Sequence, residues 1–292
     1  MIKCFEELYE HYDGTMNQIH FLFFSTGISS NEVFTYKEAI PQEDAHLFVE
    51  AMQKEVADHE LRNHWTIVHR STVPKTAKPV HAIWSFKRKQ HPDGTLVKHK
   101  TRLCAHGRMQ QWGTNYWEAY STVVNMVTVR LILLLAWIYN FESKAIDFVL
   151  AFPQAELYID IWMHLPISFQ VDTENESKCY ILKLNKSLYG LKQASLNWFE
   201  KLKQSLIDRG FHPSAIDPYL YFKKGMIVMT YVDDCIIVSN SMKDINTFIT
   251  SMKDGPKEYV LTDEGDINKF LGIEIKGITR NKFKLSQPFL IE

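Results

Sequence analysis

The feature that most constrains this chain is an acidic pair set between two apolar, β-branched runs. Residues 226–232 and 235–238 are each long enough for a strand, and Asp233 and Asp234 stand between them. Neighbouring side chains of a strand point to opposite faces of a sheet, so adjacent carboxylates can serve one site only where the backbone turns. The pattern therefore predicts a β-hairpin with the Asp pair at its apex.

The acidic residues have two interpretations. Asp is a common turn residue, and an isolated Asp-Asp pair is most often only a turn. A carboxylate without a partner near an apolar core is costly, however, and a metal ion removes that cost. Asp147, an acid within the largely apolar segment 143–152, is likewise either a strand-end cap or a metal ligand.

The three carboxylates together favour the metal interpretation. Asp147, Asp233 and Asp234 at two strand ends can hold two Mg²⁺ ions, with Mn²⁺ as a substitute. Such ions activate the 3′-hydroxyl of a primer and stabilise the departing pyrophosphate. Mg²⁺ binds to a few carboxylates completed by substrate phosphates, so two or three Asp residues suffice.

Helix and strand patterns mix along the rest of the chain. Phe48, Met52 and Val56 recur every four residues after Pro41, which predicts a helix with one apolar face. Further helices are expected at 126–141 and 192–209, segment 143–152 starts like a strand, and two more strands are expected at 267–275 and 281–285. Because there is no regular βαβ alternation, we predict an α+β fold.

A basic hairpin is predicted after the proline-containing linker 70–80. Two extended segments starting at Trp84 and Thr95 are joined through Pro-Asp-Gly, a frequent turn. The net charge of −1 counts against a nucleic-acid partner, but the sum hides an uneven distribution. A single acid, Asp93, accompanies the cations Lys87, Arg88, Lys89, Lys98, Lys100, Arg102 and Arg108. We therefore expect a basic face here.

Composition disfavours several classes of protein. The four cysteines are scattered without a C-x-x-C pair, so we expect no disulfide framework, no zinc knuckle and a reducing, intracellular setting. The most apolar run, 131–138, is too short to span a bilayer. The N-terminus carries acids where a signal peptide would be hydrophobic. No membrane partner is expected.

A series of short motifs makes the sequence similar to a known family. In chain order they are TYKEA, W-x-F-K-x-K with PDG, RLCAHG, VRLILLLA, IDFVLAFPQAEL, SLYGLKQA at 187–194, YVDD at 231–234 and FLGIEI at 270–275. With these motifs in this order, the chain resembles the copia-type reverse transcriptases of retrotransposons. SLYGLKQA and YVDD are the most specific of them.

The resemblance implies an RNA-directed DNA polymerase with palm and fingers, the antiparallel palm sheet being backed by helices. Residues 41–292 would form the reverse transcriptase domain: fingers about 65–125, palm about 126–265, and primer grip with the start of the thumb about 266–292. Residues 1–40, which lack a clear period, would form a loosely ordered N-terminal segment. We recognise neither a ribonuclease H nor an integrase segment.

The resemblance also implies roles for single residues. Asp147, Asp233 and Asp234 would be the catalytic metal ligands. Phe152 would exclude the 2′-hydroxyl of a ribonucleotide, with plain core packing as the alternative. The residues that would contact the nucleotide, the primer or the template are Arg102 and Lys100 (or Lys98) for the triphosphate, Gln193 and Gly190 for the nascent base pair and template, Tyr231 before the Asp pair, and Gly272 at the primer end. For the cations, a solvated hairpin face remains the alternative.

The implied partners are an RNA or DNA template with its primer and a deoxynucleoside triphosphate; no oligomeric state is predicted. The expected location is a cytoplasmic transposon particle. The main rival is a truncated, inactive transposon remnant that folds or binds nucleic acid without polymerising. The intact aspartates disfavour it, whereas the neutral charge and the unrecognised C-terminal domain favour it. Another palm-type nucleotidyltransferase is disfavoured by SLYGLKQA.

Overall fold

A computed structural model of the chain describes residues 33–90, 95–121, 123–167, 169, 179–254, 258–267, 269–270, 273–279 and 282–286. It divides into two compact units. Unit 1 comprises Met1–Met109 and Trp162–Leu182, and unit 2 comprises Gln110–Ile161 and Lys183–Glu292. Each unit is therefore assembled from two separate stretches of the chain.

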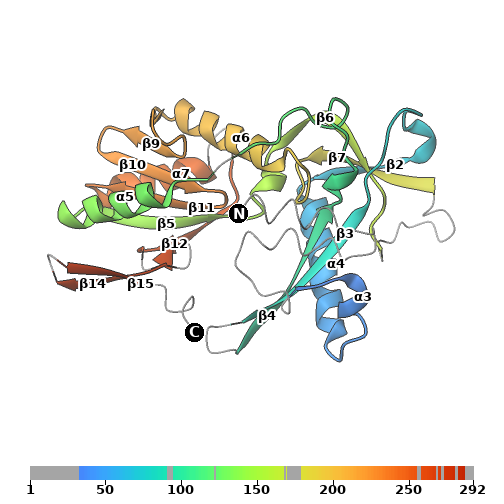
Figure 1. The fold of residues 1–292 in the computed structure, drawn as a ribbon, viewed down its shortest axis with the longest axis horizontal. Coiled ribbons are helices and arrows are strands. Elements are labelled where there is room, and N and C mark those ends of the chain that lie inside the picture. The colour runs from blue at the N-terminus through green and yellow to red at the C-terminus, as the bar shows by residue number, and fades with distance from the viewer. Residues whose placement is uncertain are drawn as a thin grey trace, which may run out of the picture. The chain divides into compact units, whose positions relative to one another are not determined.

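Unit 1 is built on the antiparallel hairpin of β3 (Ala82–Gln90) and β4 (Leu96–Ala105), shown in Figure 1. Strand β1 (Val33–Phe34) pairs with β3 and extends this sheet. The predicted basic hairpin is thus confirmed, although its connecting residues 91–94 lie outside the described residues. The other elements of this part of the chain are α3 (Tyr36–Ala39), α4 (Ala45–Leu61), β2 (Trp65–His69), η3 (Arg70–Thr72) and η4 (Gly107–Met109).

Helix α4 covers one face of the hairpin. Phe48 packs edge-on against Phe86 and His99, with ring centroids 5.3 and 4.6 Å apart. Just before the helix, Asp44 accepts hydrogen bonds from Arg88 at 2.7 Å and bonds to His99 at 2.6 Å. The bonds to Arg88 and then His99 hold the pKa of Asp44 well below its usual range. One face of the hairpin is therefore occupied by α4 and its flank.

Unit 2 is built on a six-stranded antiparallel sheet with the order β12-β5-β11-β10-β9-β8. Its strands are β5 (Glu142–Phe148), β8 (His212–Pro213), β9 (Leu220–Lys223), β10 (Met226–Tyr231), β11 (Asp234–Ser239) and β12 (Leu261–Gly265). A second sheet contains β13 (Lys269–Phe270), β14 (Ile273–Thr279) and β15 (Lys282–Ser286). A further sheet has the order β2-β7-β6, and the boundary between the units falls within β6 (Glu156–Met163) and β7 (Tyr180–Lys186).

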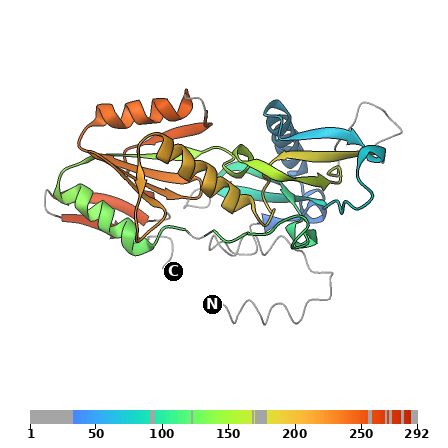
Figure 2. The ribbon, with the colours of Figure 1, turned by 90° about the horizontal axis from the view of Figure 1, so that it is seen from above.

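Helices lie on both faces of the six-stranded sheet. Helices α6 (Ala194–Asp208) and α7 (Met242–Lys253) pack against the face that carries Ile146, Val228 and Ile237. Helix α5 (Met126–Ile138) packs against the opposite face, which carries Ile236 and Val238. Figure 2 shows α7 and α5 on opposite sides of the strands. The mixed helices and antiparallel sheets agree with the predicted α+β class.

Helix α6 forms where the amphipathic pattern predicts a helix at 192–209. Trp198, Leu202 and Leu206 recur every four residues and are all buried against the sheet. Gly210 follows with a φ of +82°, a conformation in which glycine avoids the strain of other residues. This helix begins at Ala194, the last residue of the SLYGLKQA segment, so it fixes that segment to the sheet.

Strand β5 confirms that segment 143–152 starts as a strand; it ends at Phe148, before the chain turns at Leu150, whose φ is +51°. Other details differ from the sequence-based expectation. The helix expected to open at Pro41 begins at Ala45, because residues 41–44 form turns that present Asp44 to Arg88. Within the segment expected to be loosely ordered, residues 33–34 pair with β3 and residues 36–39 form a capped helical turn. Residues 1–32 lie outside the described residues.

None of the described helices is both long enough and apolar enough to cross a membrane.

Candidate active site

A row of polar side chains crosses unit 2 at one end of its sheet. Tyr231 of β10 lies directly opposite Asp234 of β11, Asp234 lies opposite Asp147 of β5, and Asp147 lies opposite Thr262 of β12. Residues directly opposite each other on antiparallel strands project from the same face, with Cβ atoms about 4.5–5.5 Å apart. The fold thus brings Asp147 and Asp234, which are far apart in sequence, side by side.

The predicted hairpin is confirmed, but its apex is a two-residue turn of Val232 and Asp233, and Asp234 is the first residue of β11 and not part of the apex. Val232 has a φ of +56°, an uncommon conformation for a β-branched residue. Both turn carbonyls are bound from outside the hairpin. The backbone N–H of Phe148 donates to Asp233 at 2.8 Å, and the indole N–H of Trp198 donates to Val232 at 2.6 Å. The turn that carries Asp233 is therefore held by two other elements, β5 and α6.

Burial and the neighbouring acids both disfavour the charged form of Asp234. Burial, followed by the negative charges of Asp233, Asp147 and Glu264, raises the pKa of Asp234 from 3.8 to about 7. A carboxyl group with this pKa is partly protonated at neutral pH, and a bound cation would favour its ionised form. The site thus has the electrostatic character of a cation site.

Glu264 is a fourth acid that the sequence gave no reason to select. It lies at an irregularity of β12, where the pairing with β5 shifts register between Asp263 and Gly265. The hydroxyl of Thr262 donates to its Oε1 at 2.6 Å. The neighbouring Asp263 instead forms an ion pair with Lys144 at 2.6 Å. Only the pairing of β12 with β5, which no local motif encodes, brings Glu264 near Asp234.

The carboxylates of this site fit Mg²⁺ only if substrate phosphates supply further oxygen ligands. Among the described residues, no group of three or more His, Cys, Asp or Glu side chains is arranged to hold a metal ion by itself. The row supplies the adjacent pair Asp147 and Asp234, with Asp233 in the turn beside them. Mg²⁺ is commonly bound through one or two carboxylates plus substrate phosphates. The carboxylates fit that pattern.

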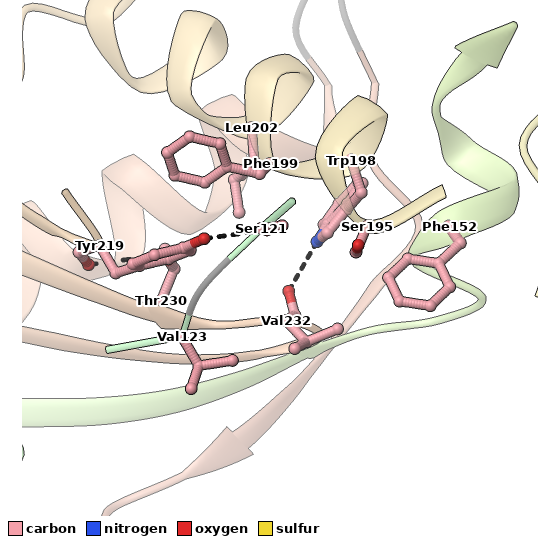
Figure 3. A pocket seen from close by; sticks show the side chains of 10 residues that line it. All are labelled: Ser121, Val123, Phe152, Ser195, Trp198, Phe199, Leu202, Tyr219, Thr230 and Val232. Carbon is pink, nitrogen blue, oxygen red and sulfur yellow. Dashed lines mark hydrogen bonds between the residues drawn. The ribbon is translucent and has the colours of Figure 1, made fainter. Parts of the chain in front are cut away.

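Phe152 lies just beyond β5, as the first residue of η5 (Phe152–Gln154). Its ring is 5.1 Å from the ring of Tyr189, which belongs to the SLYGLKQA segment. It also lines a cavity of about 70 Å³ together with Trp198 and Val232, and Figure 3 shows these side chains around it. Phe152 is thus partly buried between the apolar core and the Asp-bearing turn.

The SLYGLKQA segment is tied to the loop that precedes α5. Gly190 has a φ of +87°, which glycine adopts without strain. Gln193 is only 5% exposed; its amide accepts from Gln110 at 2.9 Å and donates to the carbonyl of Asn115 at 3.0 Å. The Gln193 side chain is therefore engaged within the protein, and Lys192 binds Gln110 through its backbone N–H at 2.8 Å.

The nucleotide-binding cations predicted on the hairpin lie in unit 1. Strand alternation places Lys98, Lys100 and Arg102 on one face of β4, opposite the face that packs on α4. Their partners across the hairpin are Lys89, Lys87 and Ser85, so two more lysines join the same face. The expected basic face is present, and it is broader than the three candidates. Gly272, the predicted primer-end residue, lies outside the described residues.

Comparison with known proteins identifies the family. Residues 62–291 match the family described as reverse transcriptase (RNA-dependent DNA polymerase). The chain belongs to this family. This confirms the resemblance on which the sequence motifs converge.

Curated proteins that are similar to this chain include polyproteins of transposons. The chain is 33% identical to the Retrovirus-related Pol polyprotein from transposon TNT 1-94 of Nicotiana tabacum, over 88% of the chain and 19% of that protein. It is 31% identical to the corresponding polyprotein from transposon RE1 of Arabidopsis thaliana, over 78% of the chain and 15% of the relative. It is 27% identical to the Transposon Ty1-DR1 Gag-Pol polyprotein of Saccharomyces cerevisiae, over 86% of the chain and 14% of the relative. The chain thus spans less than a fifth of these curated relatives.

Proposed function

We propose that this chain is an RNA-directed DNA polymerase of a retrotransposon, transferring a nucleotide from a deoxynucleoside triphosphate to a primer 3′-hydroxyl. The observation that carries the proposal is the direct pairing of Asp147 with Asp234, beside a turn that holds Asp233. A truncated remnant would have no need to keep three carboxylates at one end of a sheet, where burial and then their mutual repulsion raise the pKa of Asp234 to about 7.

In this proposal Asp147, Asp233 and Asp234 hold two Mg²⁺ ions, for which Mn²⁺ can substitute. When bound, the ions supply Lewis-acid activation of the primer hydroxyl and charge neutralisation at the phosphates. The chain's own part is to keep the carboxylates in place and ionised. Tyr231, in the same row as Asp234, closes the apolar side of the site.

Unit 2 corresponds in this proposal to most of the palm, and unit 1 to most of the fingers. Phe152 contacts the sugar edge of the incoming nucleotide and excludes a 2′-hydroxyl. The basic face that includes Lys100 and Arg102 binds the triphosphate, since guanidinium and ammonium groups suit phosphate oxygens. Gly190 allows close approach of the template, and Gln193 acts indirectly, because its amide holds the loop residues Gln110 and Asn115.

The proposed partners are an RNA or DNA template, its primer and a deoxynucleoside triphosphate, and the proposed location is a cytoplasmic transposon particle. The template–primer duplex would be bound mainly through its backbone. The residues about 266–292 would grip the primer end, with Gly272 among them.

Primer extension on poly(rA)/oligo(dT) with Mg²⁺ tests the proposed function. Wild type should extend the primer, and Asp233→Asn combined with Asp234→Asn should not. Asp263→Asn is the matched control: it also removes an acid near the row, but Asp263 is paired with Lys144 on the other face of β12. A folded wild type that extends no primer would support the inactive remnant instead.

A further inference from the structure

The turn that carries Asp233 accepts a hydrogen bond from helix α6, which precedes the turn in sequence and packs on one face of the sheet. The indole N–H of Trp198, on α6, donates to the carbonyl of Val232 at 2.6 Å (Figure 3). Trp198 is 2% exposed, so water does not compete effectively for this bond. The bond joins α6 directly to the residue before Asp233.

Val232 needs an external restraint because of its backbone. Its φ of +56° is unfavourable for a β-branched residue, and such a conformation persists only where the surroundings enforce it. The N–H of Phe148 restrains the next carbonyl, that of Asp233, at 2.8 Å. Trp198 therefore restrains one side of the turn and β5 the other.

One side of the Trp198 ring packs against other aromatic rings, and the other side borders a cavity. Its ring packs edge-on against Phe148 and Tyr259, with centroids 5.0 and 5.9 Å away. It also lines the cavity of about 70 Å³ into which Val232 and Phe152 project. Because the cavity leaves room for Val232 to shift, packing alone does not fix the turn, and the hydrogen bond supplies the missing restraint.

We propose that Trp198 is a positioning residue for metal binding: its N–H holds the Val232–Asp233 turn so that the Asp233 carboxylate stays beside Asp234 and Asp147. This inference rests on the proposed polymerase function. It assigns Trp198 no contact with substrate or metal; its effect passes through the Val232 carbonyl.

Trp198→Phe tests the inference, because phenylalanine keeps an apolar ring and removes the N–H. Two quantities are measured: calorimetric Mn²⁺ affinity with dTTP and a dideoxy-terminated primer–template, and the Mg²⁺ concentration for half-maximal primer extension. Loss of one buried hydrogen bond should weaken Mn²⁺ binding and raise the half-saturating Mg²⁺ concentration by about tenfold. The KM for dTTP at saturating Mg²⁺ should change less than twofold, roughly the scatter of an unperturbed contact.

Trp84→Phe is the matched control. The indole N–H of Trp84 donates to the carbonyl of Ile167 at 3.0 Å, and its side chain is 4% exposed, but it lies in unit 1. This variant should lose thermal stability and keep wild-type Mn²⁺ affinity. If Trp198→Phe does not fold, Trp198→benzothienylalanine serves instead, since sulfur replaces the N–H without changing the shape of the ring.

Wild-type Mn²⁺ affinity in a folded Trp198 variant would overturn the inference and leave the proposed function intact. Equal weakening in the Trp84 and Trp198 variants would also overturn it, because the effect would then reflect general stability. A wild type that neither binds Mn²⁺ nor extends primers would overturn both proposals.

Discussion

Each unit contains a set of like charges on antiparallel strands, but the two sets are held very differently. In unit 2, Asp147 and Asp234 are half-buried, directly paired, and flanked by a strained turn. In unit 1, Lys98 and Lys100 are exposed and share their face with other cations. A buried carboxylate requires a large free energy of desolvation, so each one must have a defined role. An exposed cation requires little and contributes little, so its neighbours can replace it. We therefore expect single substitutions to matter greatly in unit 2 and little in unit 1.

The largest effect is expected for Asp147→Asn. It removes one of two paired carboxylates, and losing several kcal/mol of charge stabilisation corresponds to about 10³-fold in kcat for primer extension. Steady-state extension measures the rate, with Asp263→Asn as the control for charge removal nearby. A loss below tenfold would contradict the importance of the pairing between β5 and β11.

The combined substitution of Lys98, Lys100 and Arg102 by Ala is expected to be next. Each of these exposed or partly exposed cations contributes up to about 1 kcal/mol, or about fivefold, so replacing all three should weaken nucleotide binding by about 10²-fold. Lys100→Ala alone should raise the KM for the nucleotide at most about fivefold. KM at several salt concentrations separates these cases. If Lys100→Ala alone raised the nucleotide KM as much as the triple substitution does, the expected difference between the two units would be wrong.

Phe152→Ala is expected to change selectivity more than rate. Removing a ring that excludes a hydroxyl should reduce discrimination against ribonucleotides by about 10- to 100-fold. The ratio of kcat/KM for dTTP and UTP measures this. Phe199→Ala, which enlarges the same cavity without the proposed sugar contact, should leave the ratio unchanged. Unchanged selectivity in the Phe152 variant would reduce it to a core residue.

The smallest effect concerns stability without metal. The pKa of Asp234 is raised by folding, so the folded state binds this proton more tightly and its stability falls as pH rises from about 4 to about 7. Asp234→Asn should therefore raise Tm by a few degrees at pH 8 and have less effect at pH 4. Thermal unfolding in chelator at both pH values tests this. An equal change at both would show that ionisation is not the cause.

The sequence predicted what depends on local pattern. The hairpin around Asp233 follows from two apolar β-branched runs, and a helix at 192–209 follows from its amphipathic pattern. The pattern predicts Leu196 and Phe199 on the apolar face, whereas the structure buries Trp198 beside Leu202 and Leu206. The strand-like start of segment 143–152 was also predicted, but the exact end of the strand was not, because the apolar run continues through the turn at Leu150.

The parts of the candidate site that could not be predicted depend on long-range pairing. The register that places Asp147 beside Asp234 and Thr262 joins strands far apart in sequence. Glu264 approaches Asp234 only because β12 pairs with β5. The bond from Trp198 to Val232 depends on how α6 packs on the sheet, and the amphipathic pattern of α6 indicates neither the burial of this ring nor the partner of its N–H.

The most direct test of the central claim is to locate the bound metal ion. The protein is mixed with dTTP, a dideoxy-terminated primer–template and Fe²⁺ in place of Mg²⁺. Ascorbate and peroxide then generate hydroxyl radicals that cleave the backbone near the bound ion. Mass spectrometry should find cuts near Asp147 and near Asp233 and Asp234, lost in Asp147→Asn and retained in Asp263→Asn. Cuts concentrated elsewhere, or unaffected by Asp147→Asn, would contradict the proposed metal site.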